Sequence, residues 1–340
     1  LLVSIIAPKQ SRLKHIYVSK RQMHESMANK KLIIDTDAGV DDANAILMAL
    51  SYQDVEVVGI TTVSGNILVK QVTINVLRVL KVANRMDIPV YYGCEEPLLG
   101  VKKPNGVHYH GTDGLGDVPD SSTLDKMNLK DEHAVQALLR MSRQFEGELT
   151  LVCLGPLTNI AVALRIDPCF GTRLKNCFIM GGNHQGRGNV TVSAEFNFNY
   201  DPEAAFVVLS QLRAPITIVT WELSTSHSLP KVVYNNLRSM KTKKAEFLKS
   251  IEAHSLEFNK QNDDDTFNAC DAIAMAAALD NSIITMATRV YTTVEVKGQY
   301  TSGQMIVDWS GQLKKEHNVT LITSIDDSKL LQMMYKTEVE

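Results

Sequence analysis

Short aliphatic runs alternate with longer amphipathic segments along the chain from Lys31 onward. The runs are rich in Val, Ile and Leu, which is typical of strands that helices cover on both faces. Predicted strands span residues 31–37, 55–64, 88–93, 149–155, 177–182 and 216–222, and predicted helices span residues 41–51, 67–84, 156–166 and 201–212. This alternation predicts an α/β fold, with a mostly parallel, open, Rossmann-like sheet and helices on both faces.

The C-terminal third follows a different pattern. Residues 230–280 have mainly helical character, and residues 291–298, 301–309 and 318–326 have the composition of strands. Short turns such as Lys297-Gly298-Gln299 join some of these strands. Because short connections favour antiparallel partners, additional antiparallel strands are expected near the C-terminus.

The stretch before the first predicted strand differs in composition from the rest. Residues 1–7 are apolar but too few for a convincing signal peptide, and residues 8–30 are basic and polar. We therefore expect residues 1–30 to form a flexible N-terminal extension. No linker rich in Pro, Gly or Ser and no internal repeat interrupts residues 31–340, which we predict to be a single domain.

The overall composition and net charge indicate which kinds of molecule the protein is expected to bind. With 44% hydrophobic and 21% charged residues, the 340-residue chain is typical of an ordinary soluble globular protein. A formal net charge of -3 provides no basic surface for nucleic acid or an anionic membrane, so we expect a small-molecule partner. The cysteines are odd in number and scattered, which indicates neither a disulfide framework nor a zinc site and favours a reducing, cytoplasmic location, with secretion left open. They are Cys94, Cys153, Cys169, Cys177 and Cys270.

Four carboxylates lie within eight residues where the first predicted strand ends and the next segment begins, namely Asp35, Asp37, Asp41 and Asp42. Like charges a few ångströms apart repel by roughly 1 to 4 kcal/mol per pair, so such a cluster needs a cation or a helix N-terminus to offset it. Asp41 and Asp42 begin a predicted helix, Gly39 permits a tight turn, and carboxylate oxygens suit Ca²⁺ or Mg²⁺. The alternative is N-capping by Asp41 with the other acids in solvent, but a cap needs only one aspartate.

The segment DTDAGVDDA (35–43) resembles the N-terminal signature of the nucleoside hydrolase family, which includes inosine- and uridine-preferring enzymes. The usual form is DTDPGxDDA, and Ala38 here stands in the place of the proline. Further segments resemble family segments in the same order: GITTVSGN (59–66), HYHGTDGLG (108–116), LGPLTNIA (154–161), MGG (180–182), SAEFNFNYDPEAA (193–205) and CDAIAMA (270–276). The resemblance spans roughly residues 31–336, and the first signature together with AEFN-x3-DPEAA carries most of its specificity.

The resemblance implies hydrolysis of the N-glycosidic bond of ribonucleosides to ribose and free base, with bound Ca²⁺, as in purine salvage. It implies that the Ca²⁺ ligands are the Asp37, Asp42 and Asp271 carboxylates and the Leu154 main-chain carbonyl, and that Asp37 is the general base. A metal lowers the pKa of bound water, and a carboxylate in reach can take its proton as the water attacks the anomeric carbon. The resemblance also implies a homodimer or a homotetramer.

The side chains that recognise ribose are implied by the same resemblance. They follow predicted strands, and a methionine would pack near the sugar: Asp41, Asn66, Met180, Asn189, Glu195 and Asn197. A single Asn in such a loop is usually a turn residue, but these residues stand together in motif register. Asp35 would support the loop, with its contact to the metal left open. His110, in a loop with three glycines, matches a mobile family region beside the base.

Cys270 marks a departure from the best-known nonspecific members, which carry a histidine there that helps the base to leave. A neutral thiol with a pKa of about 8.5 is a poorer proton donor than an imidazolium, so leaving-group activation must come from elsewhere or be weaker. This cysteine is characteristic of a third branch of the family. A thiolate nucleophile is the alternative, but the anionic Asp271 beside it should raise the thiol pKa, so we expect a buried, inert sulfur.

The identity of the base is left open by these residues. The purine-specific branch stacks the base between tryptophans, and this chain has only Trp221 and Trp309. Trp221 ends a predicted strand and can approach the site, whereas Trp309 is expected in the core. Purines are the expected substrates, because N7 accepts a proton more readily than any pyrimidine atom beside the bond. The acidic run from Asp263 to Asp265 is expected to be a solvated loop near the pocket mouth.

Two other functions compete with nucleoside hydrolysis. A phosphatase of the haloacid dehalogenase type also begins with a strand ending in Asp-x-Asp, but its motif places Thr or Val where this chain has Gly39, and this segment offers no Lys or Arg for phosphate. A catalytically silent nucleoside or calcium binder would keep the pocket without the leaving-group acid. The presence of every proposed metal ligand and of the general base favours activity.

Overall fold

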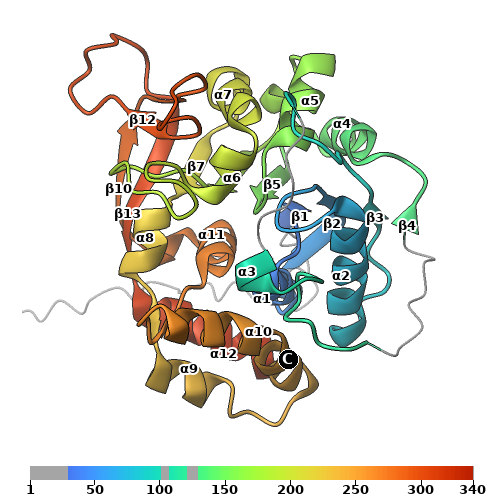
Figure 1. Ribbon diagram of the computed structural model, residues 1–340. Helices are drawn as coiled ribbons and strands as arrows, with labels where there is room; N and C mark the ends of the chain where they lie inside the picture. The colour runs from blue at the N-terminus through green and yellow to red at the C-terminus, as the bar shows by residue number, and fades with distance from the viewer. Residues whose placement is uncertain (1–29, 101–106, 121–128, 340) are drawn as a thin grey trace, which may run out of the picture.

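The computed structural model describes residues 30–100, 107–120 and 129–339 (Figure 1). Apart from Lys30, the predicted N-terminal extension, residues 1–30, lies outside the described residues. A nine-stranded sheet crosses the described part of the chain. In spatial order its strands are β10 (Ile284–Val290), β13 (Val319–Ile325), β7 (Ile216–Val219), β6 (Asn176–Met180), β5 (Leu149–Cys153), β1 (Lys30–Thr36), β2 (Val55–Thr62), β3 (Val90–Tyr91) and β4 (Leu129–Lys130).

Neighbouring strands from β13 to β4 pair in parallel, and β10 pairs antiparallel with β13 at one edge. The central strand β1 is buried on both sides. Leu32 and Ile34 point into one hydrophobic layer and Ile33 into the other, because successive side chains alternate across a strand. Both faces of the sheet therefore need helices, and the predicted α/β class with a mostly parallel sheet is confirmed.

Helices cover both faces of this sheet (Figure 1). One layer contains α1 (Val40–Leu50), α2 (Val69–Val82), α10 (Lys243–Gln261), α11 (Cys270–Leu279) and α12 (Asp327–Val339). The other layer contains α4 (Ala134–Gln144), α5 (Thr158–Ile166) and α7 (Pro202–Gln211). The apolar faces of these helices complete two hydrophobic cores, one on each side of the sheet.

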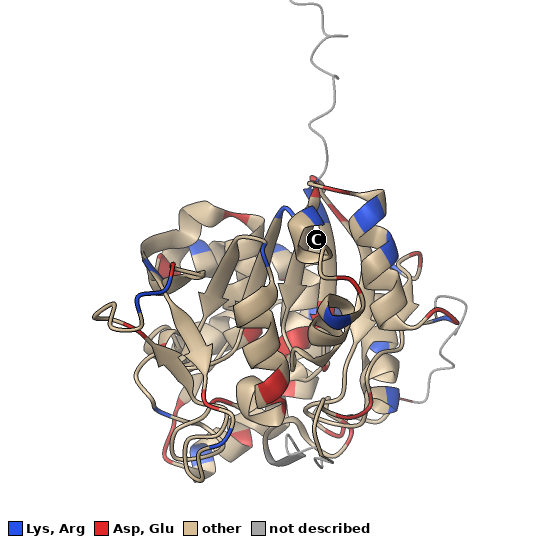
Figure 2. Cartoon of the chain, turned by 90° about the horizontal axis from the view of Figure 1, so that it is seen from above, with Lys and Arg blue, Asp and Glu red and all other residues tan. Residues whose placement is uncertain are grey.

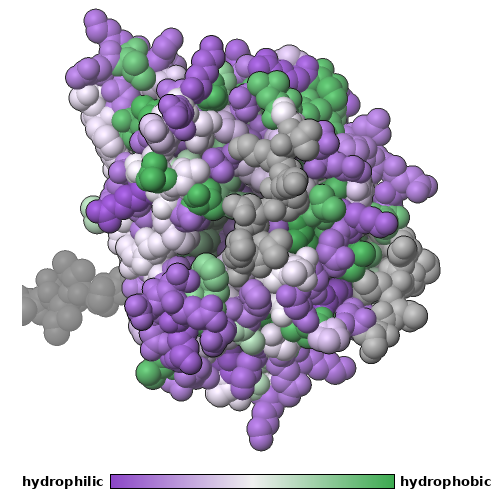
Figure 3. Space-filling model, in the orientation of Figure 1, coloured by the Kyte–Doolittle hydropathy of each residue, from purple (hydrophilic) through white to green (hydrophobic). Residues whose placement is uncertain are grey.

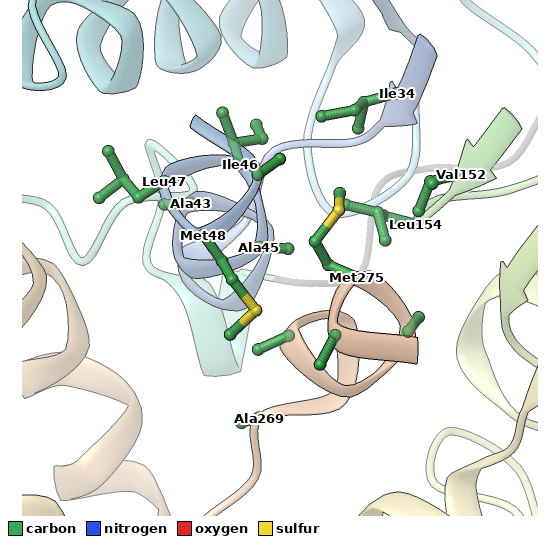
Figure 4. Packing of buried hydrophobic residues seen from close by; sticks show 14 of the residues in the cluster. Ile34, Ala43, Ala45, Ile46, Leu47, Met48, Val152, Leu154, Ala269 and Met275 are labelled. Atoms are coloured by element: carbon green, nitrogen blue, oxygen red, sulfur yellow. The ribbon is translucent and has the colours of Figure 1, made fainter. Parts of the chain in front are cut away.

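Helices α1 and α11 pack against each other in the first layer, as Figure 4 shows. The sequence of α11, CDAIAMAAAL, consists largely of alanine, whose small side chain lets two helices approach closely. Met48 of α1 is directed toward α11, and Met275 of α11 lies beside Leu154 (Figure 4). Acidic residues occupy the first turn of both helices. The packing of α1 against α11 therefore determines how close these carboxylates lie to one another.

Two small antiparallel pairs lie outside the main sheet. They are β8 (Leu229–Pro230) with β9 (Thr266–Phe267), and β11 (Thr292–Val294) with β12 (Met305–Val307). Shorter helical segments complete the described chain: α3 (Val107–His110), η3 (Gly171–Arg173), α6 (Phe196–Tyr200), α8 (Trp221–Ser226), α9 (Lys231–Leu237) and η4 (Asn281–Ile283).

The expected antiparallel strands near the C-terminus are confirmed by the β11–β12 and β10–β13 pairs. Strand β10 and helix α4 are among the elements missing from the predicted set. Most residues of β10 are exposed, and an edge strand needs no apolar alternation. Helix α4 is capped by His133, which is not among the usual signals for a helix start.

None of the helices in the described ranges combines the length and the apolar character that crossing a membrane requires. Hydrophilic residues cover much of the face seen in Figure 3, and hydrophobic residues form separate patches on it. All five cysteines are free thiols.

Candidate functional site

A cavity of about 570 Å³ opens at the carboxyl ends of the parallel strands. The strand order reverses between β1 and β5, which is where ligands bind in open α/β sheets. Every residue predicted for the site from the sequence lines this cavity: Asp37, Asp41, Asp42, Asn66, His110, Leu154, Met180, Asn189, Glu195, Asn197, Cys270 and Asp271. The fold thus collects side chains from both halves of the chain.

Three carboxylates converge at one end of the cavity. One oxygen from each of Asp41, Asp42 and Asp271 lies within 4.8 Å of the others. The first two stand in the first turn of α1 and the third in the first turn of α11. Figure 2 shows acidic residues in the middle of the molecule as well as on its rim. This trio differs by one member from the predicted metal ligands, because Asp41 takes part in it and Asp37 lies beside it.

Asp37 is held closely by the chain around it. Its Oδ2 accepts a hydrogen bond from the Asn66 main-chain N–H at 2.8 Å, and its side chain is 1% exposed. Gly65 and Gly155 both lie close to this carboxylate. A Cβ atom added at Gly65 would lie 2.2 Å from Asp37 Oδ2, and one added at Gly155 would lie 2.9 Å from Asp37 Oδ1. Burial first, and then the charge of Asp42, raise the pKa of Asp37 well above its usual value.

Asp42 is fixed by the turn between β1 and α1. Its Oδ1 accepts from the Thr36 hydroxyl, and its Oδ2 accepts from the Gly39 N–H at 2.8 Å. Burial raises the pKa of Asp42 to about 6, with the charge of Asp41 as the next cause. Burial likewise raises the pKa of Asp41 to about 6. The pKa of Asp271 is raised by burial and then by the charges of Asp41 and Asp42.

The cluster is suited to a divalent cation of the hard class. Among the described residues that line the cavity, none is Lys or Arg, so no side chain there offsets the negative charge. The donors are carboxylate oxygens and a main-chain carbonyl, the groups that Ca²⁺ and Mg²⁺ prefer. Burial disfavours charged carboxylates. The positive charge of a bound cation would therefore allow several of these buried acids to be ionised at the same time.

Asp35, at the end of β1, lies behind this cluster. Its Oδ1 accepts from the Thr61 hydroxyl at 2.5 Å and from the Asn159 amide at 2.8 Å, and its Oδ2 is buried without a hydrogen-bond partner. Burial raises the pKa of Asp35 to about 7. Asp35 does not line the cavity, which agrees with a supporting position.

The opposite wall comes from the segment that enters α6. Glu195 accepts from the main-chain N–H groups of Gly182, Asn197 and Phe198 at 2.7, 2.8 and 3.1 Å. Burial raises the pKa of Glu195 to about 7. The Asn197 amide donates to Leu154 O at 2.7 Å. These bonds leave Glu195 and Asn197 in fixed orientations on the cavity wall.

His110 lies on the Gly-rich loop at the cavity edge. Its Nδ1 accepts a hydrogen bond from the Val40 N–H at 3.2 Å, which places the ring proton on Nε2. Burial lowers the pKa of His110 to about 4, so the ring is neutral at pH 7. Gly111, Gly114 and Gly116 all adopt positive φ, a conformation that glycine reaches without a steric penalty.

Cys270 begins α11 and is buried. Burial, followed by the charge of Asp41, raises the pKa of this thiol, so it is protonated at pH 7. Trp221 begins α8 and lines the cavity, as the sequence suggested. The prediction for Trp309 is wrong: its side chain is 57% exposed, because the segment after β12 runs outside the sheet rather than into a core. Asp264, from the acidic run, also reaches the cavity.

Sequence reasoning missed one wall of the cavity. This wall contains Tyr109, Phe258, Asn259, Asn262 and Asn268. Tyr109 precedes His110 within the motif HYHGTDGLG, so this motif could have identified Tyr109 as a site residue. Phe258 and Asn259 lie near the C-terminal end of α10, where the sequence has no family motif, and the packing of α10 against other elements, α3 among them, brings them to the site.

A family model for the inosine-uridine preferring nucleoside hydrolases matches residues 32–332. The chain belongs to this family. The inosine-uridine preferring nucleoside hydrolase of Leishmania major is 34% identical over 304 residues, which cover 88% of this chain and 94% of that protein. Probable uridine nucleosidase 1 of Oryza sativa subsp. japonica is 37% identical over 229 residues, which cover 66% of this chain and 68% of that protein. A solved inosine-guanosine nucleoside hydrolase has a TM-score of 0.85 at 31% identity and covers 91% of this chain and 98% of that one.

The resemblance predicted from the motifs is therefore confirmed at the level of the family. This nucleoside hydrolase family member is a hydrolase that acts on nucleosides, and the phosphatase alternative is set aside. The names of its relatives include inosine, guanosine and uridine, so they do not select one base. The meaning of Cys270 and the roles of single residues stay predictions.

Proposed function

We propose that this nucleoside hydrolase cleaves the N-glycosidic bond of ribonucleosides to ribose and free base, depends on Ca²⁺ and prefers purines. The observation that carries the proposal is the convergence of buried carboxylates from α1 and α11, with Asp37 beside them, in a cavity whose described lining has no Lys or Arg. Such a cluster is stable as a charged group only with a cation, and a cation at this position also serves the chemistry.

The residues that would hold the ion are Asp37, Asp42, Asp271 and the Leu154 carbonyl, with Asp41 next to them. A bound Ca²⁺ would supply a water of lowered pKa and an anchor for sugar hydroxyls. We choose Ca²⁺ over Mg²⁺ because the family resemblance implies it and because mixed carboxylate and carbonyl donors in irregular positions suit the larger ion.

Asp37 is the proposed general base. Its Oδ2 is already oriented by the Asn66 N–H, and the close contacts of Gly65 and Gly155 hold the carboxylate in one position. It takes a proton from the attacking water as the water oxygen bonds to C1′ and the electron pair of the C1′–N bond leaves with the base. The surrounding carboxylates stabilise the positive charge that develops on the ribose ring.

Ribose hydroxyls need partners that both accept and donate hydrogen bonds. The cavity offers Asp41, Asn66, Glu195, Asn197 and, at its exposed edge, Asn189. Met180 lies at the end of β6 among these residues and provides an apolar surface for the sugar. This arrangement supports the ribonucleoside as the substrate class.

The preference for purines rests on the aromatic side chains of the cavity. Tyr109, Trp221 and Phe258 are among its lining residues, and such a lining favours a large flat ring system. Purine N7 is also a better acceptor for a proton or a hydrogen bond than any pyrimidine atom next to the bond. Both points favour inosine, guanosine and adenosine over uridine and cytidine.

A panel assay tests the proposal. Release of free base from purine and pyrimidine ribonucleosides is measured with Ca²⁺ and with EDTA, for the wild type and for Asp37→Ala. We expect turnover only with Ca²⁺, faster turnover of purines, and a loss of several orders of magnitude in the variant. Tight nucleoside binding without turnover would support the silent binder instead, and activity that survives both EDTA and Asp37→Ala would remove the mechanism.

The assembly implied by the family resemblance, a homodimer or a homotetramer, is part of the proposal. Light scattering after size-exclusion chromatography measures it directly. A mass of one chain at micromolar concentration would contradict it.

A further inference from the structure

The departing base accumulates negative charge as the glycosidic bond breaks, and some group must offset it. In the position of the family's histidine this chain has Cys270, whose thiol holds its proton too tightly to transfer it readily. If the proposed function is right, a hydrogen-bond donor for the base must therefore come from elsewhere on the cavity wall.

Tyr109 has the properties of such a donor. It lines the same cavity as Cys270 and Trp221. Its hydroxyl oxygen is buried and has no hydrogen-bond partner among the described residues. The Asn259 side chain lies close enough to lower the pKa of this hydroxyl, which an amide does by donating to the phenol oxygen, and the same amide donates to the Thr266 carbonyl at 3.0 Å. Neither contact uses the hydrogen of the phenol. A buried hydroxyl left without a partner costs about 1 to 3 kcal/mol, which a ligand atom in the cavity can recover.

The ring of Tyr109 is held firmly from both sides. It makes edge contacts with His110, with ring centroids 4.9 Å apart, and with Phe258, with centroids 6.0 Å apart. The Ser255 hydroxyl of α10 donates to the Tyr109 main-chain carbonyl at 2.7 Å. The ring is thus held in one orientation on the cavity wall, so little freedom is lost on binding.

Tyr109 lies on the cavity in which the proposed reaction takes place. It lines this cavity together with Asp41 and Cys270, and burial first and then the charges of these two residues raise the pKa of its hydroxyl. Because its pKa is raised, the phenol is protonated at pH 7 and has a hydrogen to donate.

Other polar groups on this wall are already engaged. The Asn262 amide donates to the Phe258 carbonyl at 2.8 Å, as the Asn259 amide does to Thr266. The Asn268 Oδ1 accepts from the Ser228 hydroxyl. Among the described residues of this wall, Tyr109 is the one whose buried side-chain oxygen has no hydrogen-bond partner.

We propose that the Tyr109 hydroxyl donates a hydrogen bond to a ring nitrogen of the departing base and so takes the place of the histidine that this chain lacks. One water is consumed: its oxygen bonds to C1′, the C1′–N electron pair leaves on the base, Asp37 takes one proton of the water, and the base recovers a proton from solvent. Tyr109 keeps its proton throughout and stabilises the anionic base as it forms.

Two substrates with different leaving groups test this role. The base of inosine, hypoxanthine, is a poor leaving group as an anion and needs a donor, whereas p-nitrophenyl β-D-ribofuranoside releases p-nitrophenolate, which is stable without one. Tyr109→Phe should lower kcat for inosine by about 10²-fold and change kcat for the nitrophenyl riboside by less than about threefold. Tyr92→Phe is the matched control, because it removes a hydroxyl that bonds to Glu95 on the surface.

The outcomes separate this proposal from the proposed function. Equal slowing of both substrates would show that Tyr109 only positions the site, and no slowing of inosine would show that the hydroxyl is not used; either result overturns the inference while nucleoside hydrolysis stands. A wild type that cleaves neither substrate with Ca²⁺ would overturn the proposed function and this inference with it. Melting curves of Tyr109→Phe within about 2 °C of wild type establish that the variant is folded.

Discussion

Asn197 and Leu154 are joined by a 2.7 Å hydrogen bond, in which the side-chain amide of Asn197 donates to the main-chain carbonyl of Leu154. The same amide donates to the Met180 carbonyl at 3.1 Å. One side chain therefore ties together the carboxyl ends of β5 and β6. Because a carbonyl oxygen has two lone pairs, Asn197 leaves the second lone pair of Leu154 for the proposed metal and fixes its direction.

Replacing Asn197 by leucine should remove both hydrogen bonds at nearly constant volume. We expect the free energy of unfolding to fall by about 1 to 3 kcal/mol, because two buried carbonyls lose a donor. The Ca²⁺ concentration for half-maximal activity should rise by about 10- to 100-fold. Calcium titration of nucleosidase activity measures this, with the exposed Asn281→Leu as control. An unchanged calcium requirement would argue against Leu154 as a ligand.

Gly65→Ala should damage the site more than the fold. The added Cβ would lie 2.2 Å from Asp37 Oδ2, so the carboxylate has to move. A displacement of this kind costs on the order of 10²-fold in kcat, because the general base leaves its attacking position. Steady-state kinetics together with a melting curve check this. A variant with wild-type kcat would mean that Asp37 is not held where the chemistry needs it.

Ala38→Pro should harm this chain although proline is the usual residue of the family signature. Ala38 has φ of 30°, and proline requires a φ near about −65°. Its N–H also donates to the Thr36 hydroxyl at 3.1 Å, and proline has no N–H. Backbone strain of about 1 to 3 kcal/mol adds to the lost hydrogen bond. Urea unfolding of Ala38→Pro beside Ala38→Gly measures the effect; a proline variant as stable as wild type would contradict the observed turn.

Without metal, stability should fall as the pH rises. Burial raises the pKa of Asp41 and Asp42 to about 6 and that of Glu195 to about 7. A raised pKa means that the folded state binds the proton more tightly, so the stabilisation is complete below the unfolded value of about 4 and is lost as pH rises through 6 to 7. Melting temperatures in EDTA should therefore decrease between pH 5 and pH 8.

Added Ca²⁺ should reverse this trend, since it binds the ionised carboxylates. The increase in melting temperature on adding Ca²⁺ should be larger at pH 8 than at pH 5, and at a concentration of 100 Kd it corresponds to about 2.7 kcal/mol. Asp271→Asn should abolish most of the increase. A melting temperature in EDTA that rises through this pH range would show that the acids are not forced together by the fold.

Arg238→Met should be among the most destabilising substitutions away from the site. The guanidinium bonds to both oxygens of Glu252 at 2.6 and 2.7 Å and pairs with Glu338, and all three side chains are buried. Glu252 in turn accepts from Asn44 of α1 at 2.9 Å, which connects this network to the helix that bears Asp41. Loss of one partner of a buried pair costs about 3 to 5 kcal/mol.

Urea denaturation measures this cost, and the double variant Arg238→Met with Glu252→Gln provides the control. Because the double variant no longer leaves Glu252 buried with an unpaired charge, it should regain part of the lost stability. A single variant within about 1 kcal/mol of wild type would contradict the assignment of a paired buried charge.

Most of the sheet could be predicted because its strands are buried on both faces. Leu32, Ile33 and Ile34 have to be apolar together, and such runs stand out in a sequence. The edge strand β10 is mostly exposed, so its sequence needs no such apolar run. The same physical reason explains Trp309, whose apolar character suggested a core position that the chain after β12 does not provide.

The positions of the acidic residues could also be anticipated, because the carboxyl ends of parallel strands meet at one edge of the sheet. The pairing of Asp42 with Asp271 is different. These residues are brought within ligand distance of each other by the alanine-rich contact between α1 and α11, which spacing along the chain does not specify. The prominence of Asp41 in that trio, with Asp37 beside it, likewise comes from the packing of the two helices.

The amino-acid sequence by itself determined the family, the class of fold and the chemical types of the groups at the strand ends, because these depend on local pattern and on motifs. Only the tertiary structure decided which oxygens converge, which hydroxyl is left without a partner at Tyr109, and which helix closes the cavity with Phe258 and Asn259. The reason is that burial and distance are properties of contacts between segments far apart in the chain, and no local pattern records them.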